Sequence, residues 1–85
     1  MSTSGERVKA AILEIVDNQL KDNTPPETNE TYQRLMKQGY SPEEARELIG
    51  AVVSSEIFEV MKNQQTYNQK RFIKALHKLP KMPWE

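Results

Sequence analysis

The residue best placed to do chemistry in this chain of 85 residues is Glu56, which falls within an apolar helical pattern. Counted at about 100° per residue from Ala45, Glu56 lies at about 20°, inside the stripe that contains Val52 and Val60. Burial raises the pKa of a carboxyl group and makes it a candidate for proton transfer, whereas a basic or hydroxyl partner holds it in place. We favour the second interpretation, a buried carboxylate that fixes the register between helices. The partners expected for it are Tyr32, Arg71 and His77.

Other catalytic or metal-binding patterns are weak in this sequence. Glu56 and Glu59 share a helix face and His77 lies on the next predicted helix, but the second carboxylate set of a di-iron bundle is missing. The chain has no cysteine, no Gly-x-Ser-x-Gly pattern and no second histidine, and its three glycines are isolated from one another. We therefore predict a protein that is not an enzyme and that uses no cofactor and no metal.

The charges cancel over the whole chain but are unevenly distributed along it. Residues 1–59 carry six basic and eleven acidic groups, a net charge of −5, and residues 60–85 carry six basic groups and one acidic group, a net charge of +5. The simpler interpretation is that the basic segment folds back on the acidic part, and the alternative is a surface that binds phosphate or an acidic partner. Net neutrality favours the first, since a dedicated nucleic-acid domain is usually basic. The predicted basic helix face comprises Lys70, Arg71, Lys74 and Lys78.

The element that must position these groups is a central helix over about residues 42–62. Ser41 and Glu44 have the spacing of a capping box, and Pro42 suits the first helical position. Apolar residues then lie on two flanks of the helix, which is typical of a helix packed on more than one face. Gly50 costs about 1 kcal/mol relative to alanine inside a helix, so we expect another helix, from this chain or from a second copy, to cross closely there. One flank comprises Ala45, Leu48, Ile49, Val52, Val53, Ile57 and Val60, and the other Ala51, Phe58 and Met61.

Three further helices are predicted, over Ser4–Leu20, Pro25–Gln38 and Gln69–Lys78. Thr24 has capping-box spacing for the second of them, and Gly39 supplies its left-handed end. Asn68 is the expected cap of the last helix, with Thr66 as the alternative. The fold class is therefore all-α, a compact bundle of four helices around the central one, in a single domain over residues 1–85.

The last residues, 80–85, cannot continue a helix because Pro80 and Pro83 interrupt it. We expect an extended tail whose Met82 and Trp84 dock on the bundle, since a lone tryptophan in a small protein is usually part of the core.

Composition sets limits on stability and location. The apolar fraction is 36%, below the usual value of about 45–50%, so a second copy of the chain is one way to complete the core, and a homodimer is an open option. No apolar run approaches membrane-spanning length, and the first residues lack the pattern of a signal peptide. We expect a cytoplasmic protein without membrane contact.

Several segments together resemble a known group of domains. These segments are ETYQRL (30–35), GYSPEEA (39–45), EIFEV (56–60), RFIKALHKLP (71–80) and PWE (83–85). They resemble small helical domains of bacterial and archaeal proteins whose function is unknown. The resemblance covers about residues 8–85 and implies an all-helical module, and it carries no activity or site residue to this chain.

The function predicted from these observations is a non-enzymatic module that binds another protein or itself. Methionine and tryptophan are enriched in interface cores, and a basic rim suits an acidic partner. The alternative is an accessory protein that binds nucleic acid through the basic helix. The predicted interaction surface comprises Met61, Lys70, Arg71, Lys74, Lys78, Met82 and Trp84.

Overall fold

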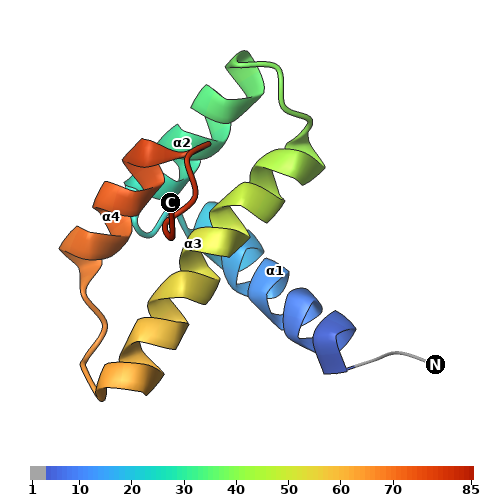
Figure 1. Ribbon diagram of the computed structural model, residues 1–85. Helices are drawn as coiled ribbons and strands as arrows, with labels where there is room; N and C mark the ends of the chain where they lie inside the picture. The colour runs from blue at the N-terminus through green and yellow to red at the C-terminus, as the bar shows by residue number, and fades with distance from the viewer. Residues whose placement is uncertain (1–3) are drawn as a thin grey trace.

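The computed structural model describes residues 4–85, and that part of the chain forms four α-helices and no strand. They are α1 (Ser4–Asp22), α2 (Pro26–Lys37), α3 (Pro42–Asn63) and α4 (Gln69–Lys78). Helix α3 packs against each of the other three and runs through the middle of the molecule (Figure 1). The predicted all-α bundle around a central helix is confirmed.

The core lies where α3 meets the other helices. Helix α3 contributes four of the buried apolar side chains, and each of the other helices contributes at least one. Nearly complete burial of such side chains stabilises a fold by about 1.5–3 kcal/mol each. The buried apolar residues are Val16, Leu35, Ala45, Ile49, Val52, Val53, Phe72, Leu76 and Leu79.

The corner between α2 and α3 is formed by the glycine at the end of α2 and by the capping box at the start of α3, as the sequence predicts. Gly39 has φ of 105°, and the backbone N–H of Tyr40 donates to the carbonyl of Leu35 at 3.1 Å, which closes the end of α2. At the start of α3, the hydroxyl of Ser41 accepts from the Glu44 N–H at 3.0 Å, and the Glu44 carboxylate accepts from the Ser41 N–H at 2.8 Å. The predicted stop and capping box are both confirmed.

The corner between α1 and α2 differs from the prediction. Helix α1 extends to Asp22, and α2 begins at Pro26. Thr24 does not cap α2, because its hydroxyl donates to the carbonyl of Asp22 at 3.0 Å. The cap position falls one residue later, on Pro25, which makes no side-chain cap bond. The second proline takes the first helical position, which shifts the start of the helix along the chain.

Polar side chains hold the first turn of α2 against α1. The hydroxyl of Thr28 donates to the side-chain oxygen of Gln19 at 3.0 Å, and the amide of Asn29 donates to the carbonyl of Leu20 at 2.9 Å. Thr28 is completely buried. A buried hydroxyl needs such a partner, because leaving it unpaired costs about 1–3 kcal/mol.

Arg34 links α2 to the end of α4. Its Nη1 donates to the carbonyl of Leu79 at 2.8 Å, and its Nη2 donates to the carbonyl of Leu76 at 2.9 Å. The last carbonyls of a helix lack partners in the regular helical pattern and carry partial negative charge. A guanidinium group supplies both hydrogen-bond donors and positive charge at this position. This contact joins residues more than forty positions apart.

The tail turns back at its end and is not extended. The N–H of Glu85 donates to the carbonyl of Met82 at 3.1 Å, and the carboxylate of Glu85 accepts from the Met82 N–H at 2.8 Å. Pro83 suits the second position of such a turn, and Trp84 follows it at the outer corner. Trp84 is 69% exposed, so the expectation that it docks in the core is wrong, while Met82 is half-buried.

Candidate interaction surface

Glu56 lies at the junction of α3 and α4 and is 7% exposed. Arg71 donates to it twice, from Nε to Oε2 at 2.8 Å and from Nη2 to Oε1 at 2.7 Å. The backbone N–H of Asn68, the residue that caps α4, also donates to Oε1 at 3.0 Å. The predicted buried carboxylate is confirmed, and of its three expected partners Arg71 is the one that binds it.

The charge of Glu56 is held by these donors. The hydrogen bonds from Arg71 lower the pKa of the Glu56 carboxyl, burial opposes that shift, and the backbone N–H of Asn68 lowers the pKa further. A carboxylate with a lowered pKa, whose two oxygens already accept three hydrogen bonds, is poorly suited to proton transfer near neutral pH. The arrangement fits the structural interpretation, in which Glu56 fixes the start of α4 against α3.

The metal-site hypothesis receives no support from the side-chain positions. The carboxylate of Glu59 accepts from the amide of Asn63 at 2.7 Å, and His77 is exposed on α4. Within residues 4–85, no three histidine, aspartate or glutamate side chains come close enough together to hold a metal ion.

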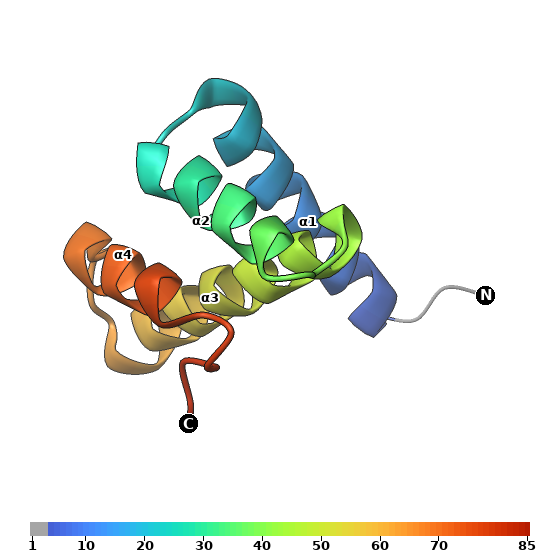
Figure 2. The same cartoon turned by 90° about the horizontal axis from the view of Figure 1, so that it is seen from above.

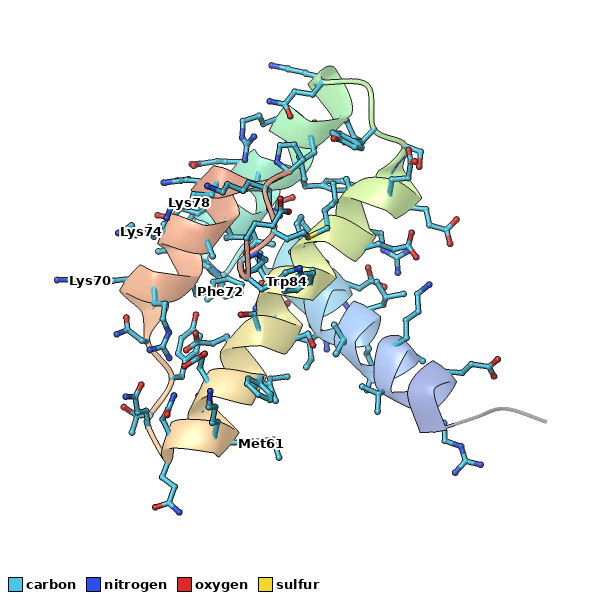
Figure 3. All side chains as sticks on the ribbon, viewed as in Figure 1. Met61, Lys70, Phe72, Lys74, Lys78 and Trp84 are labelled. Atoms are coloured by element: carbon cyan, nitrogen blue, oxygen red, sulfur yellow. The ribbon has the colours of Figure 1, made fainter. Side chains whose placement is uncertain are left out.

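The basic face of α4 is open to solvent. Lys70, Lys74 and Lys78 are exposed and project along the outer side of the helix (Figure 3). None of the three forms an ion pair in the described part of the chain, whereas Arg71 is paired with Glu56. Of the predicted basic face, only Arg71 therefore folds back on an acidic side chain among residues 4–85.

A groove of about 270 Å³ separates α3 from α4 and is bordered by the tail. Lys74 and Lys78 line it on one side, Glu56 and Glu59 on another, and Met82 contributes an apolar edge. The groove therefore brings Met82 together with part of the basic face of α4. The lining carries both signs of charge, so the groove is not a dedicated anion site.

A second surface lies between the N-terminal half of α1 and the C-terminal half of α3, and we call it the apolar notch. Both views of the ribbon show these two half-helices diverging from their crossing (Figures 1 and 2). The large apolar side chains exposed on them are Val8 (57%), Ile57 (39%), Phe58 (60%) and Met61 (75%), and Ile15 (38%) is exposed on the C-terminal half of α1. A hollow of about 260 Å³ lies between Val8 and Ile12 of α1 and Gly50 and Ala51 of α3. A separate hollow of about 170 Å³, lined by Ile15, Ile57 and Phe72 among others, lies toward α4.

The angle of the notch is set by the crossing of α1 over α3 at Gly50. A Cβ atom on Gly50 would lie 3.3 Å from Cγ2 of Ile12, so the helices approach closely there, as the sequence predicts. Arg46 donates twice to the carboxylate of Asp17, at 2.7 and 2.8 Å, and fixes the crossing from one side. The close approach and the ion pair hold the helices at a single crossing point, beyond which their free ends separate.

The prediction located only part of this surface. Met61 was expected on an interaction surface, and it is the most exposed apolar residue of the notch. Ile57 and Phe58 were expected to pack inside the bundle, and that expectation is wrong because the two side chains are 39% and 60% exposed. Met61 lies at the end of α3, and Trp84 lies nearer its middle in Figure 3. The hydrophobic pattern indicates that both flanks of α3 pack against other segments. It does not indicate whether those segments belong to this chain or to a partner.

Comparisons of the chain with protein-family models, with curated proteins and with solved structures found no match. The resemblance to small helical domains of unknown function therefore stays a prediction. None of the helices in residues 4–85 is long and apolar enough to cross a membrane.

Proposed function

We propose that this protein is a non-enzymatic interaction module that binds a protein partner through the apolar notch. The observation that carries the proposal is the exposure of Ile57, Phe58 and Met61 on the C-terminal half of α3, with Val8 exposed on the N-terminal half of α1. The fractional exposures of these four side chains correspond to on the order of 400 Å² of surface, which is comparable to the largest apolar patch on a typical monomeric protein. Large apolar side chains that are exposed on one half of a helix, as Ile57, Phe58 and Met61 are, are typical of an interaction surface.

The rigidity of the surrounding structure supports the same function. The crossing at Gly50 and the Arg46–Asp17 pair hold the two walls of the notch at a fixed angle. A preformed surface loses little conformational freedom on binding, so more of its contact energy appears as affinity. We place this function in the cytoplasm as part of the proposal.

The test compares partner capture by the wild-type chain and by two variants matched in charge change. The notch variant Met61→Glu adds a carboxylate to the apolar surface, and the control Gln69→Glu adds one at the start of α4, outside the notch. Affinity capture from native lysate at moderate salt is followed by quantitative comparison of the bound proteins. We expect specific binding that Gln69→Glu retains and Met61→Glu loses, whereas equal binding by all three chains would contradict the proposal.

A second candidate function is binding of nucleic acid through α4. It is favoured by the exposed, unpaired Lys70, Lys74 and Lys78 along one side of that helix. Phosphate contacts of this kind weaken as salt rises, because bound counterions are released. A titration with DNA and RNA at low salt should show binding that Lys70→Glu and Lys74→Glu reduce, and binding that is absent or indifferent to salt would exclude this function.

A further inference from the structure

We infer that the groove between α3 and α4 binds an acidic peptide in an extended conformation. Three lysines, Lys74, Lys78 and Lys81, line this groove and pair with carboxylates of the peptide. The inference goes beyond the proposed function, because none of the exposed apolar side chains of the notch lines the groove. The groove is therefore a second binding surface, with a ligand of different chemistry.

The charged side chains of the groove differ in whether this chain supplies their partners. The carboxylate of Glu56 is paired with Arg71, and the carboxylates of Glu59 and Glu85 each accept a hydrogen bond from within the chain. The three lysines are exposed, and none of them has an ion-pair partner among residues 4–85. The groups that still need a partner are therefore positive, and an occupant that carries carboxylates is complementary to them.

The spacing of Lys74 and Lys78 matches an extended segment. Residues four apart lie on the same side of an α-helix and are separated by about 6 Å along its axis. In an extended strand, residues two apart point to the same side and are separated by about 6.6 Å. Carboxylates at alternate positions of an extended peptide can therefore meet Lys74 and Lys78 in turn. Lys81 adds a third positive charge where the tail borders the groove.

The rest of the lining favours a peptide over a polyphosphate or a small molecule. Ala75, Met82 and Pro83 supply apolar atoms, and Glu56 and Glu59 supply carboxylates. A nucleic-acid backbone carries a negative charge at every nucleotide and is repelled by these carboxylates, whereas a peptide offers them N–H donors and offers the apolar atoms its own side chains. The volume of about 270 Å³ is just below the roughly 300–1,000 Å³ of sites that enclose small molecules, so it suits a few side chains of a longer segment.

The walls of the groove are fixed before any ligand binds. Arg71 joins α4 to α3 through Glu56, and Arg34 holds the end of α4. At the border of the groove, the tail is closed by the hydrogen bonds between Met82 and Glu85. A preformed site loses less conformational freedom on binding, which favours the capture of a short peptide.

The single tryptophan provides a readout of binding. Trp84 is 69% exposed and lies between Pro83 and Glu85, which line the groove, so an occupant should change its fluorescence. The probe is the capped peptide Glu-Leu-Glu-Leu-Glu, the control peptide has glutamine in place of glutamate, and calorimetry measures the same two titrations independently. We expect the acidic peptide to bind about tenfold or more tightly than the control, and its affinity to fall as salt rises. Equal affinities, or no binding of the acidic peptide at millimolar concentration by either method, would overturn the inference.

Charge reversals inside and outside the groove test its location. Lys74→Glu and Lys78→Glu should each weaken binding of the acidic peptide by about three- to tenfold, because an attraction is replaced by a repulsion. The control Lys21→Glu makes the same charge change on α1, which does not contact α4 within residues 4–85, and should alter the affinity by less than about twofold at moderate salt. Equal losses in the three variants contradict binding in the groove. Circular dichroism of each variant confirms that the helices are intact.

A parallel titration with single-stranded DNA separates a peptide ligand from nucleic acid. Lys70 is exposed on α4 but does not line the groove, so Lys70→Glu should affect an oligonucleotide more than the peptide. An oligonucleotide that binds more tightly than the peptide, and that both Lys70→Glu and Lys78→Glu weaken, overturns the inference and favours the nucleic-acid function. Partner capture through the apolar notch is measured separately, so the failure of either proposal is distinguishable from the failure of the other.

Discussion

The two halves of α3 contain similar numbers of apolar residues, but these residues are buried to different extents. In the N-terminal half, Ala45 and Ile49 are completely buried beneath the other helices. In the C-terminal half, Phe58 and Met61 are 60% and 75% exposed. The boundary lies where α1 crosses α3 at Gly50 and where Glu56 attaches the start of α4. The comparison teaches that hydrophobic periodicity identifies which faces need a partner, and that helix crossing angles decide whether the partner is internal.

The largest expected effect comes from truncating the buried half. Ile49→Ala removes a side chain with no exposed surface and leaves a cavity, which should lower the free energy of unfolding by about 3–4 kcal/mol. The matched substitution in the exposed half, Met61→Ala, should change it by less than about 0.5 kcal/mol. Urea unfolding of the two variants checks this, and similar losses would contradict the division of α3 into two halves.

Removing the carboxylate at the boundary should have the next largest effect. Glu56→Ala leaves the N–H of Asn68 and the guanidinium of Arg71 without their acceptor, and should cost about 2 kcal/mol, below the value for a fully buried pair because Arg71 is partly exposed. Unfolding in urea at neutral pH measures the loss. No change in stability would show that this junction does not hold α4.

The same junction gives a dependence on pH. The folded structure lowers the pKa of Glu56 below its ordinary value of 4.5, so its contribution to stability is complete above that pH and is lost as the pH falls through the lowered pKa. Glu56→Gln should therefore be less stable than the wild type at pH 7 and should approach it in strongly acidic solution. Unfolding measured at several pH values tests this, and a constant difference between the two chains would contradict it.

The crossing point itself should tolerate only a small addition. Gly50→Leu places a large side chain against Ile12 and Leu13, and should destabilise the fold by about 1–3 kcal/mol. Gly50→Ala should be nearly neutral, because the gain of about 1 kcal/mol in helix propensity is offset by the tight 3.3 Å contact. Thermal unfolding of both variants measures these changes. If Gly50→Leu did not lower the stability, the closest approach of α1 and α3 would lie elsewhere.

The smallest effect on folding is expected at Phe58. Phe58→Ser removes an exposed ring and its contact with Lys62, and should change the free energy of unfolding by less than about 0.5 kcal/mol. The same substitution should weaken the partner capture described under the proposed function, so folding and binding respond to it differently. A large loss of stability would place Phe58 in the core and shorten the notch.

Local features of the fold could be predicted from the sequence, and features set by distant contacts could not. The Ser41 capping box, the Gly39 stop and the Asn68 cap depend on a few neighbouring residues, and all three are confirmed. Glu56 could be identified because a carboxylate within an apolar stripe needs a donor. The exposed side chain of Trp84 depends on how the tail turns, and no local pattern determines that.

On the surface, too, local features could be predicted and features set by distant contacts could not. Met61 could be predicted as exposed and apolar, but the notch around it depends on the angle between α1 and α3. A helical wheel describes one helix and contains no crossing angles. The pairing of Arg71 with Glu56 was among the predicted alternatives, whereas the bonds from Arg34 to the end of α4 join segments that no periodicity relates.

The bonds from Arg34 have a consequence for how the molecule opens. The terminal turn of a short helix normally frays within microseconds, and its amides exchange rapidly with solvent deuterium. Here the carbonyls of Leu76 and Leu79 accept hydrogen bonds from Arg34 of α2. We therefore expect this turn to open only when both hydrogen bonds break. Deuterium uptake at the end of α4 should therefore follow the slow uptake of α2, and the two segments should behave as a single cooperative unit.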